Sequence, residues 1–483
     1  MNTEPPNPTD LHGAYDAAQA VCARALAENP LLQSAAGLCR DIAHRFRRPA
    51  VMVGGAVRDI LIGNPVADVD IATAVGIEEI AGGYRDSFGI GQSQRFGVTM
   101  VRWGEHQFEV AQFRKDGSYG DSRRPDSVSA ATSFAEDAAR RDFTINAMAL
   151  TPDGTLLDHY GGLADLRARV VRTVGAPEER FREDGLRVLR AARFASRLGF
   201  DLDPATLRAM QQLTDVVLKV SGERIREEFT KSATSGRTLA RFVELLDAAG
   251  VLAKVLPEVK ALQGLRHSPV HHPEGGVWEH VLAALKASRT ADPIANLAIL
   301  FHDLGKATTG AEKDGQPTYL GHEAAGIPIF ADITTRLRFS GEEREAIELA
   351  IHSHMLGHHF DQLSEKTVLK LRQHPHWETL LATFHADEAA RGHLFQPEQF
   401  ERKMARAEEL IAKLGAKREF DVKMRRLING TMIQSLLPGV DGKEIGRIKS
   451  AVQDEILARH FAISAVDVEA LVLKMGRTEG SQM

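Results

Sequence analysis

Residues 50–59 read AVMVGGAVRD, and this stretch decides the fold of the N-terminal part of the chain. Its apolar start predicts a short buried strand, the paired glycines allow a tight turn, and the residues after them predict a helix. At such a turn the backbone N–H groups that open the helix can face a phosphate, and glycine lets the phosphate approach closely. The stretch therefore predicts an α/β arrangement with an anion-binding turn.

Two aspartates follow this turn: Asp68 lies ten residues beyond Arg58, and Asp70 comes two residues later. Side chains of a strand alternate between its faces, so both carboxylates are expected on one side. Carboxylate oxygens suit Mg²⁺, which keeps several waters and recruits substrate phosphates. Two such ions can activate an attacking hydroxyl and hold the leaving phosphate in an in-line displacement. A lone Asp-x-Asp is more often a solvated strand end, but the glycine turn nearby favours a metal site.

Two arginine-containing segments come next, RRDFTINA at residues 140–147 and EDGLRVLR at residues 183–190. The apolar spacing of residues 181–198 predicts one helix, on which Asp184 and Arg187 are one turn apart. An aspartate beside an arginine offers an acceptor and a fork of donors to a base edge, while further arginines can bind phosphate oxygens. Ion pairs on a solvated helix explain the same spacing, and the spacing alone leaves both interpretations open.

The composition is that of a large globular protein of several domains, with 483 residues of which 43% are hydrophobic and 26% charged. This excludes a disordered or fibrous chain and a single small binding module. The formal net charge of -5 gives no overall sign of a nucleic-acid partner. Positive charge is local, because residues 216–241 hold six basic and three acidic residues and residues 401–426 hold nine and five. These two segments are candidate contacts for RNA phosphates.

The cysteine count and the apolar pattern bear on the compartment. The only cysteines are Cys22 and Cys39, too few for a disulfide framework and typical of a reducing environment. No segment approaches the ~18 consecutive apolar residues of a membrane helix. The polar, proline-rich start has no signal-peptide pattern. We therefore expect a cytoplasmic protein without a membrane partner, and its oligomeric state stays open.

Histidines are concentrated in one part of the chain, since 14 of the 19 lie within residues 267–393. There, His280, the pair His302-Asp303 and Asp387 offer imidazole and carboxylate ligands for a divalent metal such as Mn²⁺, Ni²⁺, Fe²⁺ or Mg²⁺. This part contains no cysteine, which argues against a structural zinc cage. The ligand set resembles that of the HD-superfamily phosphohydrolases. The resemblance implies a metal-dependent phosphatase or cyclic phosphodiesterase activity.

Three more histidines of this part, His322, His352 and His354, have two interpretations. They can complete a second metal site or bind phosphate, or they can simply be packed in the fold. The histidines with the pattern of loop residues are given no role: His358, His359, His374 and His376.

The motifs taken together resemble one known family. In order and spacing, VGGAVRD at residues 53–59, Asp68-x-Asp70, RRDFTINAMA at residues 140–149 and EDGLR at residues 183–187 are similar to the bacterial CCA-adding enzymes and poly(A) polymerases, the class II nucleotidyltransferases. The resemblance implies template-independent addition of CCA to tRNA 3′ ends from CTP and ATP. It also implies two-metal phosphoryl transfer with Mg²⁺ and release of pyrophosphate.

The same resemblance implies roles for individual residues. Asp68 and Asp70 would hold Mg²⁺, and we add Glu109 as a third, supporting carboxylate of the catalytic site. Asp184 and Arg187 would read the Watson–Crick edge of the incoming base in place of a template. The residues expected to bind the nucleotide are Gly55, Arg58, Arg114, Arg141, Asp184, Arg187, Arg190 and Arg193.

We therefore expect an α+β fold: a small mixed-sheet, polymerase-beta-like nucleotidyltransferase head, then an all-α neck, an HD domain and a helical tail. Within the head, residues 116–134 would form the loop that moves between C and A addition. The expected parts are residues 1–45 (N-terminal tail and helix), 46–175 (head), 176–262 (neck, binding RNA and nucleotide), 263–395 (HD domain) and 396–483 (helical C-terminal tail).

Three other functions stay open. A poly(A) polymerase shares the head motifs, but such enzymes tend to be basic with cationic extensions, whereas this chain has an acidic balance. An RNA-binding regulator without transfer activity would not need Asp68, Asp70, Asp184 and Arg187 intact. A phosphohydrolase whose HD domain performs the main chemistry would use the head only to sense nucleotides. The sequence does not decide whether the chain adds both C and A or only one of them.

Overall fold

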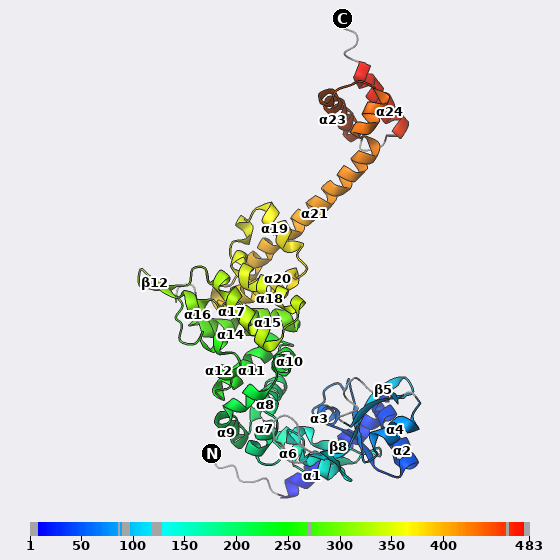
Figure 1. The fold of residues 1–483 in the computed structure, drawn as a ribbon, viewed down its shortest axis with the longest axis vertical. Coiled ribbons are helices and arrows are strands. Elements are labelled where there is room, and N and C mark those ends of the chain that lie inside the picture. The colour runs from blue at the N-terminus through cyan, green and yellow to red at the C-terminus, as the bar shows by residue number, and fades with distance from the viewer. Residues whose placement is uncertain are drawn as a thin grey trace. The chain divides into compact units, whose positions relative to one another are not determined.

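The computed structural model describes residues 8–85, 87–88, 97–116, 128–268, 272–459 and 463–477. The chain divides into two compact units, of which the first comprises Met1–His358 with Glu378–Phe395 and the second His359–Trp377 with Gln396–Met483. Figure 1 shows the course of the chain through both. Among the described helices, none combines the length and the apolar character needed to cross a bilayer.

The head is built on a mixed sheet of seven strands in the order β3-β4-β5-β2-β1-β8-β9. The strand pairs are antiparallel except for β2 with β5, which is parallel. The strand expected at the start of residues 50–59 is confirmed as β1. The bounds are β1 Ala50–Val53, β2 Asp70–Thr73, β3 Ser87–Phe88, β4 Val98–Trp103, β5 His106–Gln112, β8 Met148–Leu150 and β9 Leu156–Asp158.

Both faces of this sheet are covered. Along β1, Met52 packs into the larger apolar core and its neighbours Val51 and Val53 pack into a smaller core on the other face. The helical N-terminal part consists of two helices that meet at Asn29, whose side chain accepts hydrogen bonds from the N–H groups of Leu31 and Leu32 at the start of α2. The other head elements are α1 Pro8–Glu28, α2 Pro30–Phe46, α3 Gly55–Leu61, α4 Ile77–Gly83, β6 Arg114–Asp116, β7 Val128–Ala130, α5 Phe134–Ala139, η2 Thr144–Asn146 and α6 Gly162–Ala168.

The neck is helical, as expected, but its predicted helix over residues 181–198 is broken at Asp184 and Gly185. Asp184 is extended, with φ -146° and ψ 106°. Gly185 lies against the carbonyl oxygen of Val216, which a Cβ at this position would overlap. The neck elements are β10 Val170–Val171, α7 Pro177–Glu183, α8 Leu186–Leu198, β11 Asp201–Leu202, α9 Pro204–Gln212, η3 Thr214–Lys219, α10 Gly222–Ser232, α11 Gly236–Ala248, α12 Leu252–Val255 and α13 Pro257–Lys260.

The histidine-rich part of the first unit is also helical. It shares one continuous buried core with the neck, and Arg226 of α10 forms an ion pair with Glu343 of α18 at 3.1 Å. Its elements are α14 Val277–Ala287, α15 Pro293–Phe301, α16 Lys306–Thr309, β12 Ala311–Lys313, β13 Gln316–Thr318, α17 His322–Leu337, α18 Gly341–Ser353, η4 His354–Gly357, α20 Trp377–Ala390 and η6 Gly392–Leu394.

The second unit is all helical in its described residues, as expected for the tail. Its last three helices enclose a separate apolar core that includes Ile433, Val452 and Val472. Its elements are η5 Phe360–Gln362, α19 Glu365–Arg372, α21 Pro397–Leu427, α22 Gly430–Leu436, α23 Gly442–Ala458 and α24 Ala465–Arg477.

Candidate functional site

Three carboxylates gather where β1, β2 and β5 lie side by side. Asp70 opens β2 opposite Val53, and Glu109 on β5 immediately precedes the partner of Ile71. Asp68 stands just before β2, and both aspartates are exposed while Val69 between them is buried. Asp70 is reached by solvent, but the protein groups around its carboxylate displace much of its water. This desolvation, and then the negative charges of Asp68 and Glu109, raise the pKa of Asp70 to about 6. Such a cluster of negative charge is suited to a cation.

The turn after β1 brings its backbone close to this cluster. Gly54 has φ +76°, and a Cβ on it would lie 3.8 Å from the Asp70 carboxylate, so the position favours glycine. Arg58, one turn into α3, donates through Nη1 to the side-chain oxygen of Asn146 at 2.7 Å and pairs with Asp59 at 2.9 Å. These contacts fix a buried guanidinium beside the glycine turn.

A buried carboxylate that sequence reasoning missed holds two more arginines. Asp137 of α5 accepts from Arg140 Nη2 at 2.6 Å and from Arg141 Nη2 at 2.9 Å, and its side chain is only 1% exposed. Burial alone would raise the pKa of Asp137, but the guanidinium charges outweigh it and hold the pKa below its usual value. Its i, i+3 and i, i+4 spacing to the arginines was the available signal.

The neck contributes the pair expected to read a base. Asp184 accepts from Arg224 of α10 at 2.8 and 3.3 Å, while Arg187 pairs with Glu183 at 2.5 Å and donates to the Arg140 carbonyl at 3.0 Å. Asp184 lies in the turn that precedes α8, and not on one helix with Arg187. In the structure Asp184 pairs with Arg224, and Arg187 pairs with Glu183. Arg224 was not singled out from the sequence, because forty residues separate it from Asp184.

A second aspartate anchors the arginine that follows on α8. Asp142 accepts from Arg190 Nε at 2.8 Å and from Nη2 at 2.5 Å. Burial would raise the pKa of Asp142, but Arg190 holds it below its usual value. Arg190 thereby ties the neck to the head at the same place as the residues expected to read the base.

These groups line one cleft of about 510 Å³. Its walls combine the carboxylates of the head with guanidinium groups from both head and neck. Of the expected site residues, the lining includes Gly55, Arg58, Asp70, Glu109, Arg141, Asp184, Arg187 and Arg190.

Three expected site residues do not line this cleft within the described part of the chain. Asp68 lies just before β2, and Arg114 in β6 is close to the site through its N–H bond to Asp137 at 3.3 Å. Arg193 differs from the expectation, because its side chain is 6% exposed and pairs with Glu228 at 2.5 Å inside the neck. Arg187, Arg190 and Arg193 are spaced three residues apart. Because three residues make less than one helical turn, Arg193 points about 120° away from Arg187 around the helix axis. Most of residues 116–134, the expected moving loop, lies outside the described residues.

The second site joins the four predicted metal ligands from three places in the fold. His280 comes from α14, His302 and Asp303 follow α15, and Asp387 comes from α20. His280 Nε2 lies 3.0 Å from Asp387 Oδ1, and His302 Nε2 lies 3.2 Å from Asp303 Oδ2. All four are buried, and the Nε2 atoms of His280 and His302 make no hydrogen bond within the described residues.

Two of the three undecided histidines join this cluster. His322 Nε2 and His354 Nε2 lie 3.3 and 3.6 Å from Asp303 Oδ1, whereas His352 is exposed. Burial, and next the neighbouring imidazole of His302, lowers the pKa of His354 to about 3. His358, which was given no role, also contacts the cluster, with Nε2 3.1 Å from Asp387 Oδ2.

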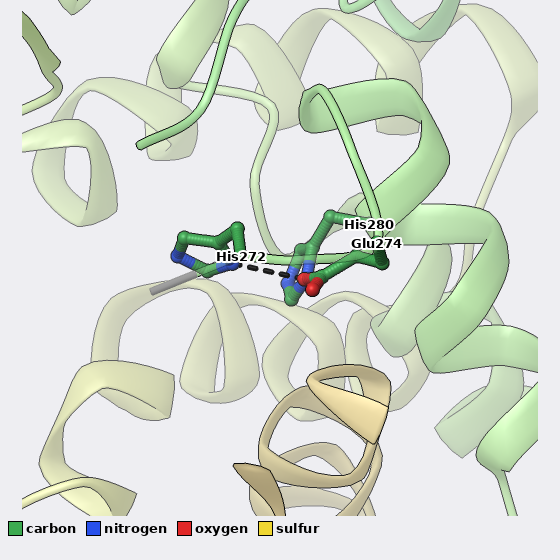
Figure 2. Close-up of side chains that lie close together, drawn as sticks. All are labelled: His272, Glu274 and His280. Carbon is green, nitrogen blue, oxygen red and sulfur yellow. Dashed lines mark hydrogen bonds and ion pairs between the residues drawn. The ribbon is translucent and has the colours of Figure 1, made fainter. Parts of the chain in front are cut away.

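The carboxylate of Glu274 lies close to His280 and His272, as Figure 2 shows. Glu274 Oε1 accepts from Nδ1 of His280 at 2.6 Å and from Nδ1 of His272 at 2.9 Å. Burial would raise the pKa of Glu274, but these hydrogen bonds lower it to about 2. The Nε2 atom of His280 points at Asp387, whereas Glu274 holds the opposite ring nitrogen, Nδ1. Glu274 therefore supports His280, one of the expected metal ligands.

A pocket of about 370 Å³ opens onto the cluster. Lys306 lies in its wall, with Nζ 2.7 Å from Asp303 Oδ2 and 3.2 Å from His267 Nε2. The pocket is lined by Asp303, His322, His354, His358 and Asp387 from the cluster, together with His267, His272, Lys306 and Tyr319 among others.

Comparison with known proteins places these sites in a family context. Residues 50–172 match the family described as "Poly A polymerase head domain", and residues 199–263 match the one described as "Probable RNA and SrmB- binding site of polymerase A". The Multifunctional CCA protein of Pseudomonas aeruginosa PAO1 is 37% identical over 330 residues, which are 66% of this chain and 78% of that protein. That of Chromobacterium violaceum is 36% identical over 326 residues, 66% of this chain and 77% of that one.

Solved structures agree in fold. The crystal structure of the Bacillus stearothermophilus CCA-adding enzyme in complex with CTP superposes with a TM-score of 0.61 at 25% identity, over 94% of this chain and 100% of that one. A tRNA nucleotidyltransferase complexed with a primer tRNA and an incoming ATP analog has the same fold, with a TM-score of 0.52 at 24% identity over 77% of this chain and 99% of that one. The chain therefore belongs to the bacterial family of CCA-adding nucleotidyltransferases.

Proposed function

We propose that the head and neck add CCA to the 3′ ends of tRNA from CTP and ATP and release pyrophosphate. The observation that carries this proposal is the single cleft in which Asp70 and Glu109 face Arg58, Arg141 and Arg190. Carboxylates for a metal and guanidinium groups for a triphosphate are what a nucleotidyl transfer requires. Membership of the CCA-adding family agrees with it.

The carboxylates fit Mg²⁺, because desolvation and then the negative charges of Asp68 and Glu109 disfavour an ionised Asp70, and a cation offsets both effects. Asp68, Asp70 and Glu109 are the residues that would hold it. When bound, Mg²⁺ would supply charge neutralisation at the α-phosphate and lower the pKa of the attacking 3′ hydroxyl.

The remaining steps belong to this chain's own side chains. Arg58, Arg141 and Arg190 are held by Asn146, Asp137 and Asp142, so their guanidinium groups are oriented before a triphosphate arrives. Asp184 supplies acceptors and Arg187 donors to the base edge, in place of a template. Since Arg224 and Glu183 occupy these groups in the structure, a correct base must compete with two ion pairs.

We also propose which surfaces meet tRNA and where the protein acts. Residues 216–241 and 401–426 carry local positive charge that suits an RNA backbone. The substrate and the two free, buried cysteines suit the cytoplasm.

The test incubates the protein with a tRNA that lacks its CCA end. CTP and ATP are then added, each alone and both together. Addition that stops after CCA supports the proposal. Long A tails from ATP alone would instead mark a poly(A) polymerase, and no incorporation would leave a regulator or a phosphohydrolase. Asp70→Ala and Glu109→Gln should lose transfer, whereas Glu105→Gln, in the exposed turn that precedes β5, should retain it. A fully active Asp70→Ala protein would contradict the site.

A second activity is proposed for the histidine cluster: metal-dependent hydrolysis of phosphoesters at RNA 3′ ends, such as 3′-phosphates and 2′,3′-cyclic phosphates. The observation in its favour is the set of buried, unsatisfied ligand atoms on His280, His302 and Asp303. Buried polar atoms without partners are costly unless a ligand satisfies them, so these residues fit a divalent cation. Such an ion would supply Lewis acidity toward water and the phosphoryl oxygens.

Hydrolysis can be tested apart from transfer. Full-length protein loaded with Mn²⁺ or Ni²⁺ should release phosphate from an RNA that ends in a 3′-phosphate and open a 2′,3′-cyclic end. His302→Ala should lose this activity and keep CCA addition. A metal-loaded wild-type protein that is inert toward both ends would refute the proposal.

A further inference from the structure

We propose that Phe194 of α8 is a positioning residue for nucleotide binding, and that its ring holds Arg58 of the head and Arg190 of the neck in place for the triphosphate. This inference rests on the proposed CCA addition and deepens it, because it gives a task to an apolar side chain in a cleft of charged groups. Phe194 lines the transferase cleft, yet it is only 8% exposed.

Three guanidinium groups converge on the ring of Phe194. The Cζ atoms of Arg58 and Arg190 each lie 5.4 Å from the ring centroid, and that of Arg193 lies 4.3 Å from it. These distances are within the ~6 Å at which the negative face of an aromatic ring attracts a guanidinium group. A ring that is covered in this way has little surface left for stacking on a base, so Phe194 acts through the arginines.

The two arginines of the cleft are each held along one edge by a carboxylate. Arg58 donates to Asp59 through Nε and Nη2 at 3.0 and 2.9 Å. Arg190 donates to Asp142 through the same two nitrogens at 2.8 and 2.5 Å. Because a guanidinium group is planar, in-plane hydrogen bonds use its edge, whereas an aromatic contact uses its face. The carboxylates and the ring therefore restrain each group in different directions.

Phe194 also lies where the two parts of the chain that supply these arginines meet. Arg58 belongs to α3 of the head and Arg190 to α8 of the neck. From the head, the fully buried Phe143 packs edge-to-face with Phe194, with ring centroids 5.6 Å apart and an interplanar angle of 72°. Edge-to-face contact is a favoured geometry of aromatic pairs, so it fixes the place of the ring.

The shared ring offsets the repulsion between two like charges. Arg58 and Arg190 are both cations, and the ring keeps them near each other before a nucleotide arrives. A triphosphate carries several negative charges along a short chain, and oriented guanidinium groups bind it without having to be ordered first. Loss of the attraction to the ring should therefore weaken nucleotide binding and leave the chemical step nearly unchanged.

The test changes the electron density of the ring while keeping its shape. Phenylalanines with one, two or three ring fluorines replace Phe194 in the full chain by stop-codon suppression. Fluorine withdraws electron density from the face of the ring and changes its size little, so it weakens the attraction to a cation and preserves the packing. The Kd for CTP is measured by equilibrium dialysis with Mg²⁺ present, and circular dichroism checks that each protein is folded.

We expect the Kd for CTP to rise with each added fluorine, reaching about tenfold for the trifluoro ring. The KM for CTP should rise in parallel, while kcat and the KM for tRNA stay within about twofold of wild type. A side chain that only fills space would leave all of these constants unchanged. The matched control is the same fluorine series at Phe242 of α11, a buried ring that packs edge-to-face with Phe229 at 5.0 Å, where the Kd should stay constant.

A Kd for CTP that stays constant along the series at Phe194, or that rises equally along the series at Phe242, would overturn the inference. Failure of the proposed function looks different. A protein that binds CTP with the expected fluorine dependence but adds no nucleotide to tRNA refutes CCA addition alone. A wild-type protein that binds no CTP refutes both.

Discussion

Replacing Asp137 by asparagine tests how much of the transferase site depends on one buried carboxylate. Each oxygen of Asp137 accepts from one guanidinium group: Arg140 at 2.9 and 2.6 Å and Arg141 at 3.2 and 2.9 Å. The arginine side chains are 19% and 17% exposed, so solvent screens them little. An asparagine keeps the shape but turns an NH₂ group toward a guanidinium and removes the negative charge.

The expected cost follows from that geometry. Removing one partner of a buried, hydrogen-bonded ion pair costs about 3 kcal/mol, which lowers the folding equilibrium constant by somewhat more than a hundredfold. The assay is urea denaturation of the full chain at pH 7, followed by far-UV circular dichroism. Asp153→Asn, an exposed carboxylate of the turn between β8 and β9, serves as the control and should change stability by less than ~0.5 kcal/mol. Equal unfolding midpoints for the two variants would refute the reasoning.

The same substitution should have a pH signature. The folded pKa of Asp137 lies below its unfolded value of about 3.9, so its contribution to stability is fully present above that value and is lost as the pH falls through the folded pKa. Wild type and Asp137→Asn should therefore differ most near neutral pH and converge in strong acid. A stability difference that stays constant down to pH 2 would contradict the ion-pair explanation.

Three further predictions follow from other contacts. Arg224→Met should fold normally but select CTP and ATP over UTP and GTP about tenfold less well in primer extension, because Asp184 loses its bidentate partner. Arg226→Met is the control, and equal selectivity of the two variants would contradict this. Gly185→Ala should lower the free energy of unfolding by about 2 kcal/mol, because the new Cβ would overlap the Val216 carbonyl. The control is Gly82→Ala, whose new Cβ would have no atom within 4 Å. Equal losses of stability in the two variants would argue against the overlap. Glu274→Gln should weaken Mn²⁺ binding by roughly tenfold to a hundredfold in a metal titration, because a carboxylate behind His280 raises its basicity; a loss no greater than that of exposed Glu279→Gln would remove the role.

The head could be predicted well because its signals are local. The run at residues 50–59 contains its own strand, turn and the start of a helix. Asp68 and Asp70 are exposed on either side of buried Val69, as expected for a strand, although β2 begins only at Asp70. The break at Asp184 and Gly185 could not be predicted, because it depends on a carbonyl that lies 31 residues further along the chain. Arg193 shows why a three-residue spacing does not keep side chains on one face. Each step of three residues turns the side chain further around the helix, and at Arg193 it points into the core.

The histidine cluster shows a similar division. The four ligands that the motif marks are together, as expected, whereas His352 and His354 were not distinguished from the sequence. Two positions two residues apart on a helix point in nearly opposite directions, so only one of these histidines can share the buried face of Ile347 and Ile351, and that one is His354. His358 was given no role because its partner Asp387 comes from a distant part of the chain, as with Arg224, whereas Glu274 is only six residues from His280 and was simply not considered.

The shared core of the first unit couples the stability of its two sites. Buried apolar residues form one continuous cluster from Leu32 of α2, through the neck, to Ala390 of α20, so the transferase cleft and the histidine cluster draw on the same folding free energy. A substitution that loosens the packing around the histidines would also lower the fraction of chains able to mature tRNA. Natural selection for tRNA maturation would therefore conserve the scaffold of the histidine-rich part even in lineages where its own chemistry had fallen out of use.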